Sequence, residues 1–118
     1  MIGRRDIITK AAGLVLAAAL LPIGTGEGRA QETVTIQISI QNHRFQPAEI
    51  RAPAGKPITL HVKNLDSTPA EFESKSLRVE KVIAGKSEGV INIRPLQPGR
   101  YQFFDDFNQQ ARGTLVVQ

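Results

Sequence analysis

The sequence predicts an all-β sandwich of seven or eight short strands within residues 31–118. Three observations lead to this fold class. Apolar and polar residues alternate over several short segments, proline and glycine separate these segments, and none of them has the 3.6-residue period of an amphipathic helix. Short strands with regular turns are typical of two sheets packed face to face. Because the segment contains neither a repeat nor a linker, we expect a single domain.

Residues 1–30 have the layout of a secretory signal peptide. Arg4 and Arg5 form a positive start, and Gly28-Arg29-Ala30 offers small residues around a cleavage point. The apolar run from Ala11 to Ile23 is shorter than the roughly 20 residues of a membrane-spanning helix. We expect export to the periplasm, by the general secretory route or, given the arginine pair, by the twin-arginine route. An uncleaved membrane anchor is the alternative.

The predicted strands follow one another with short turns between them. The first is the clearest, because Val34, Ile36, Ile38 and Ile40 alternate with polar residues. A short strand around Phe72 lies beyond the break at Pro69. Turns are expected where proline and glycine occur together or follow small residues, at Pro53-Ala54-Gly55, Ala84-Gly85 and Pro98-Gly99. The other extended segments are 45–50, 58–64, 77–83, 90–93, 101–103 and 115–117.

Composition excludes several classes of function. Residues 31–118 carry a net charge of about +2, and their lysines and arginines are scattered singly, unlike a nucleic-acid surface. We therefore expect no nucleic-acid partner. The two histidines have no serine or cysteine partner nearby, so no nucleophilic catalysis is indicated and we expect no enzyme. The chain has no cysteine and must fold without disulfides.

Three segments in order resemble the cupredoxin pattern: residues 42–50 with Ala54-Gly55, residues 64–72, and residues 98–108 with 113–117. This resemblance implies a cupredoxin-like Greek-key β-sandwich. Where that family has a histidine, a cysteine and a second histidine as copper ligands, this sequence has Ala70, Asp105 and Asn108. A type 1 copper centre needs the thiolate. The resemblance therefore implies the cupredoxin-like fold without an electron-transfer centre.

A narrower resemblance is to the EfeO-type cupredoxin-like protein, a periplasmic module that accompanies bacterial high-affinity iron permeases. It covers Pro69-Ala70-Glu71-Phe72-Glu73, residues 79–83 and residues 96–101. The resemblance implies that Glu71 and Glu73 bind metal. It also implies iron or copper as the bound ion, and an inner-membrane iron permease or another periplasmic protein as partner.

The residues themselves support part of this picture. Residues two apart in a strand share a face, so Glu71 and Glu73 are expected to point the same way, with Phe72 in the core. Two carboxylates side by side repel unless a cation or proton lies between them; a solvated strand face without a ligand is the alternative. Asp105 shares the inward face with Tyr101 and Phe103. It is expected either to bind metal or to accept backbone N–H groups in an Asx turn.

If the loops meet at one end of the sandwich, Glu71, Glu73, Asp105 and His43 converge there. Such a set suits ferric iron, Mn(II) or Cu(II). Taken alone, His43 fits an ordinary loop residue better than a ligand. Glu80 joins only if its strand reaches that end, and Asp106 is expected to face the other way.

The alternative function is a metal-free β-sandwich that serves as an interaction module for a permease or other periplasmic protein. Phe103 is expected in the core, and one of Phe104 and Phe107 is expected to pack under the last loop. An exposed phenylalanine at this loop would mark a docking patch.

Overall fold

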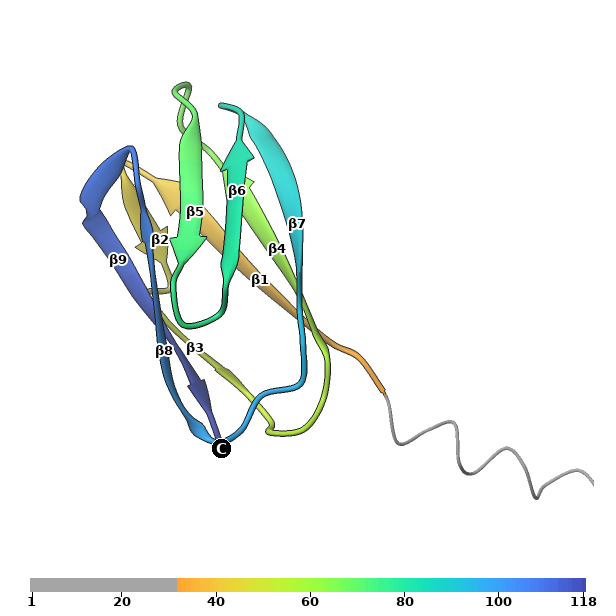
Figure 1. Ribbon diagram of the computed structural model, residues 1–118. Coiled ribbons are helices and arrows are strands. Elements are labelled where there is room, and N and C mark those ends of the chain that lie inside the picture. Colours follow the sequence, from red (N-terminus) through yellow and green to blue (C-terminus); the bar gives the residue numbers. More distant parts are fainter. Residues whose placement is uncertain (1–31) are drawn as a thin grey trace, which may run out of the picture. The chain divides into compact units, whose positions relative to one another are not determined.

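The computed structural model describes residues 32–118, in which nine strands and no helix occur (Figure 1). The expected signal peptide, residues 1–30, lies outside the described residues. No helix within residues 32–118 is long and apolar enough to cross a membrane. The strands are β1 Val34–Gln41, β2 Arg44–Gln46, β3 Glu49–Ala52, β4 Ile58–Asn64, β5 Ala70–Ser74, β6 Val79–Ile83, β7 Ser87–Ile93, β8 Gly99–Asp105 and β9 Asn108–Val117.

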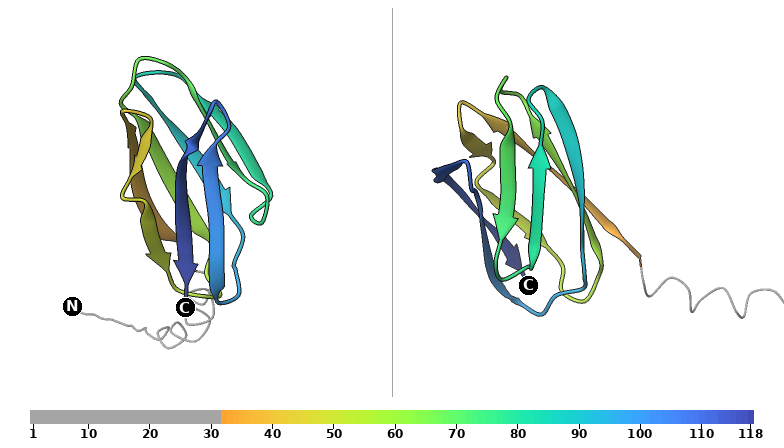
Figure 2. Two further views of the ribbon diagram at one scale, coloured as in Figure 1. Left: turned by 90° about the vertical axis from the view of Figure 1, so that its left-hand side faces the viewer. Right: turned by 45° about the horizontal axis from the view of Figure 1, so that its top comes forward.

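These strands form two sheets that pack face to face (Figures 1 and 2). One sheet has the order β2-β1-β4-β7 and the other the order β3-β9-β8-β5-β6. The pairs β1–β4 and β3–β9 are parallel, and the remaining neighbours are antiparallel. The all-β sandwich predicted from the alternation is confirmed.

The core lies between the sheets and is built from the inward residues of each alternating strand. Three phenylalanine rings from three strands meet at its centre. Phe45 from β2 contacts Phe72 and Phe103 edge to face, with ring centroids 6.0 and 4.9 Å apart. Phe72 and Phe103 stack at 5.0 Å across the β5–β8 pair. Aromatic pairs at these separations add to the stabilisation that comes from burying their area.

The strand count exceeds the seven or eight expected because β2 and β3 are separate strands. The sequence segment 45–50 looked like one extended piece. In the structure the chain leaves the four-stranded sheet after β2 and enters the five-stranded sheet with β3. Each of these strands is short and places only one or two side chains in the core, Phe45 from β2 and Ile50 with Ala52 from β3.

Asn64 at the end of β4 ties together the loops at one end of the sandwich. Its side chain is buried, and Nδ2 lies within hydrogen-bond distance of the carbonyl oxygens of Thr68, Ile83 and Ala84. Its Oδ1 accepts the backbone N–H of Asp66. Because these carbonyls precede β5 and end β6, Asn64 fixes where those two strands begin and end. The side chains discussed next project from this part of the sheet.

Candidate metal centre

β5 presents two glutamates on the outer face of the five-stranded sheet. Its residues alternate between buried and half-buried positions, with Ala70, Phe72 and Ser74 inside and Glu71 with Glu73 outside. The prediction that the two carboxylates share a face, while Phe72 enters the core, is therefore confirmed. The alternation places the glutamates next to each other on one surface of the sheet.

Two neighbouring strands bring further carboxylates to this surface. In the β5–β6 pair, Glu73 stands opposite Glu80, and Glu71 lies diagonally across from Glu80 on the same face. Asp106 lies in the two-residue turn between β8 and β9, and its backbone N–H donates to the Glu71 carbonyl at 2.9 Å. We call Glu71, Glu73, Glu80 and Asp106 the acidic cluster.

Within the acidic cluster, Glu71, Glu73 and Asp106 form a carboxylate trio. Each contributes one oxygen, and these three atoms lie within 4.8 Å of one another. Oxygen ligands bind hard cations at about 2.0–2.6 Å. Two oxygen ligands of one ion lie at most about twice this bond length apart, so the three trio oxygens are close enough to bind a single ion. Glu71 and Glu73 are half-buried and Asp106 is exposed, so a cation reaches the trio directly from solvent.

The electrostatics of the acidic cluster act most strongly on Glu71, whose pKa is raised to about 7. The largest cause is its hydrogen bond with Glu80, which requires a proton between the two carboxyls. Partial desolvation and the negative charges of Glu80, Asp106 and Glu73 act in the same direction. A cation placed here would remove this repulsion, as the proton does.

Asp105 lies on the other side of β8, and only 1% of its surface is exposed. Its inward orientation was predicted correctly. Its Oδ1 accepts two backbone N–H groups, from Glu71 and from Phe107, both at 2.9 Å. The bond to Phe107, two residues on, closes an Asx turn. Of its two expected roles, the structure shows this capping role. Asp105 stands outside the trio, and its role as a metal ligand stays a prediction.

His43 is also separate from the trio. It lies in the β1–β2 turn with a positive φ of 57°, and its Nδ1 is 3.8 Å from Oδ2 of Asp66. The backbone N–H groups of Asn42 and His43 donate to the Asp66 carboxylate at 2.8 and 2.9 Å. Both bonds lower the pKa of Asp66, and the bond from His43 has the larger effect. His43 as a metal ligand likewise stays a prediction.

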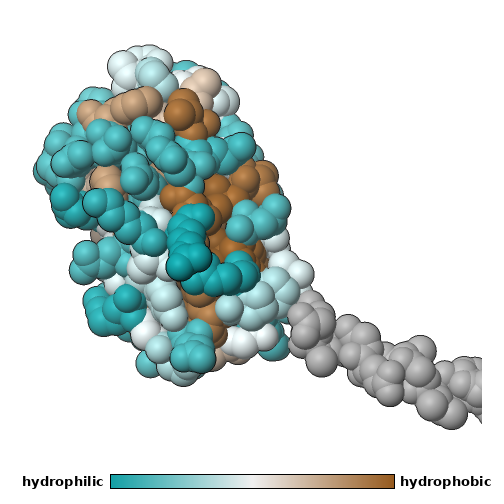
Figure 3. Space-filling view, in the orientation of Figure 1, coloured by the Kyte–Doolittle hydropathy of each residue, from teal (hydrophilic) through white to brown (hydrophobic). Residues whose placement is uncertain are grey.

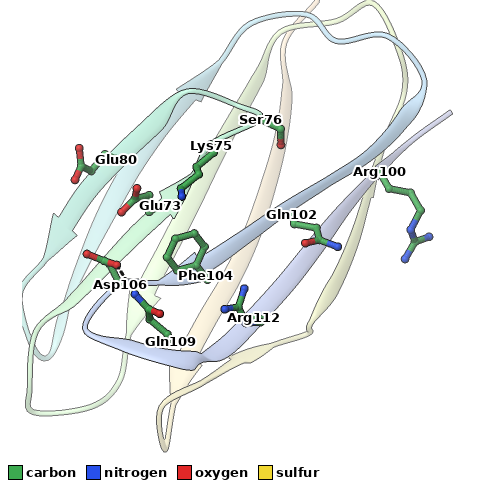
Figure 4. A pocket seen from close by; sticks show the side chains of 10 residues that line it. All are labelled: Glu73, Lys75, Ser76, Glu80, Arg100, Gln102, Phe104, Asp106, Gln109 and Arg112. Atoms are coloured by element: carbon green, nitrogen blue, oxygen red, sulfur yellow. Dashed lines mark hydrogen bonds between the residues drawn. The ribbon is translucent and has the colours of Figure 1, made fainter.

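The acidic cluster opens onto a groove along the outer face of the sheet, with a volume of about 760 Å³ (Figure 4). Glu73, Glu80 and Asp106 gather on one side of the groove in this view, and Arg100 and Arg112 lie on the other. Phe104 lies between them, with the guanidinium carbon of Arg112 5.4 Å from the ring centroid. Lys75 reaches toward Glu73 on the same side as the carboxylates, so the groove carries carboxylates and one ammonium group on one side and two guanidinium groups on the other.

Two residues of the acidic cluster were underestimated from sequence. Asp106 was expected to face away from Asp105, and it does, but this orientation brings it to the glutamates of β5. Glu80 was expected to join only if its strand reached the site; the β5–β6 register places it opposite Glu73. A short hairpin, with β5 ending at Ser74 and β6 beginning at Val79, is the signal that could have predicted this pairing.

Comparison with known proteins relates the chain to one family. Residues 12–117 match the family described as the cupredoxin-like domain. The protein RP394 of Rickettsia prowazekii (strain Madrid E) is 30% identical over 122 residues, which cover 95% of this chain and 98% of that protein.

Solved copper proteins share the fold. The metal-binding domain of the Cu(I)-exporting P-type ATPase CopA from Streptococcus pneumoniae D39 superimposes with a TM-score of 0.61 at 20% identity, over 75% of this chain and 97% of that domain. Auracyanin A, a blue copper protein from Chloroflexus aurantiacus, gives a TM-score of 0.63 at 15% identity, over 74% of this chain and all of that protein (100%). At these identities the similarity shows the fold alone.

Proposed function

The chain belongs to the cupredoxin-like domain family, and on this premise we propose that it is a periplasmic metal-binding module that handles iron or copper, in metal uptake. The carboxylate trio of Glu71, Glu73 and Asp106 holds the ion, and Glu80 supports it. A type 1 copper centre has no part in the proposal, because the chain contains no cysteine to supply the thiolate.

The observation that carries the proposal is the close approach of the three trio oxygens, all within 4.8 Å, on a fold that relatives use to bind copper. Like charges held this close need a proton or a cation between them. The resemblance of residues 69–73 to the EfeO-type protein supports iron as the ion and a permease as the recipient. An all-oxygen trio favours a hard ion such as ferric iron and also accepts Mn(II).

Metal binding by this site competes with protons. Because the pKa of Glu71 is about 7, its carboxyl is largely protonated at acidic pH, and a cation has to displace that proton. The affinity is therefore expected to fall as the pH drops below 7.

Isosteric variants of the trio test this function. Calorimetric titration of the exported protein with Fe(III)-citrate, Mn(II) and Cu(II) is expected to show saturable binding of at least one ion. Glu73→Gln and Asp106→Asn each remove a ligand charge while keeping the side-chain shape, and each is expected to weaken binding by about tenfold or more. Elemental analysis of the purified protein gives the metal that it carries.

A control variant separates ligation from general charge loss. Glu88→Gln removes a carboxylate from β7 in the other sheet and is expected to bind the ion as the wild type does. Asp105→Asn tests the sequence prediction that Asp105 is a ligand: weaker binding in this variant would add Asp105 to the ligand set. The proposal fails if the wild type binds no ion, or if the trio variants and Glu88→Gln weaken binding equally.

The alternative function, an interaction module without a metal, is favoured by one observation. Phe107 at the β8–β9 turn is 52% exposed, as expected for a docking patch near the last loop. This observation concerns the same end of the sheet as the trio, and it leads to the inference below.

A further inference from the structure

Two large apolar side chains are exposed next to the acidic cluster. Val82 on β6 is 56% exposed and stands opposite Glu71 in the β5–β6 pair. Phe107, 52% exposed, follows Asp106 in the β8–β9 turn. Each is thus an immediate neighbour of a carboxylate of the cluster. We call Glu71, Glu80, Val82, Asp106 and Phe107 the hairpin-end surface.

The backbone that carries Phe107 is held firmly in place. Its N–H donates to the buried Asp105 carboxylate at 2.9 Å, and the N–H of Asp106 donates to the Glu71 carbonyl at the same distance. The first bond connects the turn to the end of β8, and the second connects it to β5. The exposure of the aromatic ring is therefore a property of an anchored turn. When a partner covers apolar side chains that an ordered backbone holds in water, the burial of their surface lowers the free energy of the complex.

The surroundings of these apolar side chains are strongly polar. In Figure 3, hydrophilic atoms cover most of the outer face of β5, β6 and β8, and apolar atoms interrupt it near the end of β6 and along the side towards β7. A purely apolar partner would bury the carboxylates of Glu71, Glu80 and Asp106 without compensation, which is costly. A partner with cations at these positions covers the apolar groups and also pairs the charges.

We propose that the hairpin-end surface docks a polypeptide segment in which lysine or arginine residues flank an apolar side chain. The apolar side chain lies against Phe107 and Val82, and the flanking cations pair with the carboxylates of Glu80 and Asp106. A lysine or arginine over the Phe107 ring adds a cation–π contact. This inference extends the proposed function by giving the chemistry of the protein partner.

The docked segment and the metal ion share the carboxylate of Asp106, and Glu80, which pairs with the segment, stands opposite Glu73 of the trio. Binding of one therefore weakens binding of the other, and the two effects are equal in size because linkage is reciprocal. A basic partner that docks here displaces the ion from the trio. Docking and delivery of the ion are in this way parts of one event.

A titration with a synthetic peptide tests the docking surface. The probe is a short peptide in which lysines flank a leucine, added to the metal-free protein in the presence of a chelator. Amide NMR shifts are expected to change saturably at residues 71, 80, 82, 106 and 107, and the affinity is expected to fall with added salt. Phe107→Ser and Glu80→Gln are each expected to weaken binding by about fivefold or more.

The matched control is Val90→Ser, which removes a 45% exposed valine from β7 in the other sheet and is expected to bind the peptide normally. Circular dichroism checks that each variant is folded. The inference is overturned if the peptide does not bind saturably, if Phe107→Ser binds as the wild type does, or if a lysine peptide without leucine binds equally well. Metal titration of the same samples distinguishes the two proposals: an ion that binds where the peptide does not leaves the metal site standing and removes the docking surface.

Discussion

At the scale of single residues, two adjacent acids, Asp105 and Asp106, have opposite environments, because Asp105 ends β8 facing the core whereas Asp106 lies in the turn that follows. Asp105 is buried, and its charge is satisfied by two backbone N–H groups. Asp106 is exposed and lies beside Glu71 and Glu73, where negative charges repel. The same residue type thus stabilises the turn at one position and supplies a candidate metal ligand at the next.

Glu71 gives the protein a specific dependence of stability on pH. Its pKa is about 7 in the folded state against an ordinary value of 4.5. The folded protein therefore holds a proton that the unfolded chain releases, and stability falls as the pH rises from 4.5 to 7. Glu71→Gln removes this titration. We expect its free energy of unfolding, measured with urea across this range, to depend less on pH than that of the wild type.

Glu49→Gln is the control for this pH experiment, because Glu49 pairs with Arg51 and Arg100, whose charge does not change in this range. It is expected to keep the wild-type slope between pH 4.5 and 7. The lowered pKa of Asp66 stabilises the fold above pH 3.8, the ordinary pKa of an aspartate. This contribution is lost only at pH values below 3.8, outside the window of the experiment. A Glu71→Gln slope equal to that of the wild type would contradict the shared proton.

At the scale of strands and loops, the position of the acidic cluster depends on elements that are fixed by buried polar groups. Asn64 connects the end of β4 to the carbonyls that precede β5 and end β6. Asp105 connects β8 to the start of β5. These connections determine how β5 and β6 begin and end, and so where Glu71 and Glu80 meet.

Removal of the Asn64 side chain tests this role. Asn64→Ala leaves buried carbonyl oxygens without donors, and each such group costs about 1–3 kcal/mol. We expect the free energy of unfolding to fall by roughly 3 kcal/mol in urea denaturation. Asn92→Ala is the matched control: its exposed side chain makes one long contact of 3.4 Å with Thr59, and we expect a change within about 0.5 kcal/mol. Similar losses in the two variants would argue against the role of Asn64.

The strands that could be predicted from sequence are those with several alternating apolar residues. β1 and β4 each place three or more such residues in a regular pattern, so the local sequence determines both the strand and its buried face. β2 and β3 were missed as separate strands because they bury so few side chains. Their separation depends on which sheet each one joins, and this is a tertiary property.

The candidate site was also predicted only in part, because local alternation places two of its residues whereas tertiary structure places the others. Glu71 and Glu73 follow from the alternation of one strand, and local geometry was sufficient to pair them. The contributions of Glu80 and Asp106 depend on strand register and on the fold of a two-residue turn, which short-range patterns do not contain. His43 was expected to converge with them, whereas backbone bonds to the Asp66 carboxylate hold its turn.

At the scale of the whole molecule, the core and the candidate metal centre occupy opposite faces of the same sheet. The stacked rings of Phe72 and Phe103 lie inside, whereas Glu71, Glu73 and Asp106 project outward. The fold therefore has a hydrophobic core that does not depend on the ion. The site has no comparable independence, because its carboxylates repel until a proton or cation joins them.

This separation predicts how metal and stability are linked. Protein treated with a chelator is expected to remain folded and to unfold in one cooperative transition, since the core is intact without the ion. An ion at 100 times its dissociation constant is expected to raise the free energy of unfolding by about 2.7 kcal/mol, because it binds the folded state alone. Thermal and urea denaturation with and without the ion measure this gain.

The double variant Glu73→Gln/Asp106→Asn is expected to show no gain from the ion while retaining the cooperative transition. Its core residues are untouched, and the loss of two negative charges relieves repulsion at the acidic cluster. Unfolding of the wild type by the chelator would show that the ion holds the fold together and that the core is insufficient. A gain in the double variant equal to that of the wild type would place the ion elsewhere on the molecule.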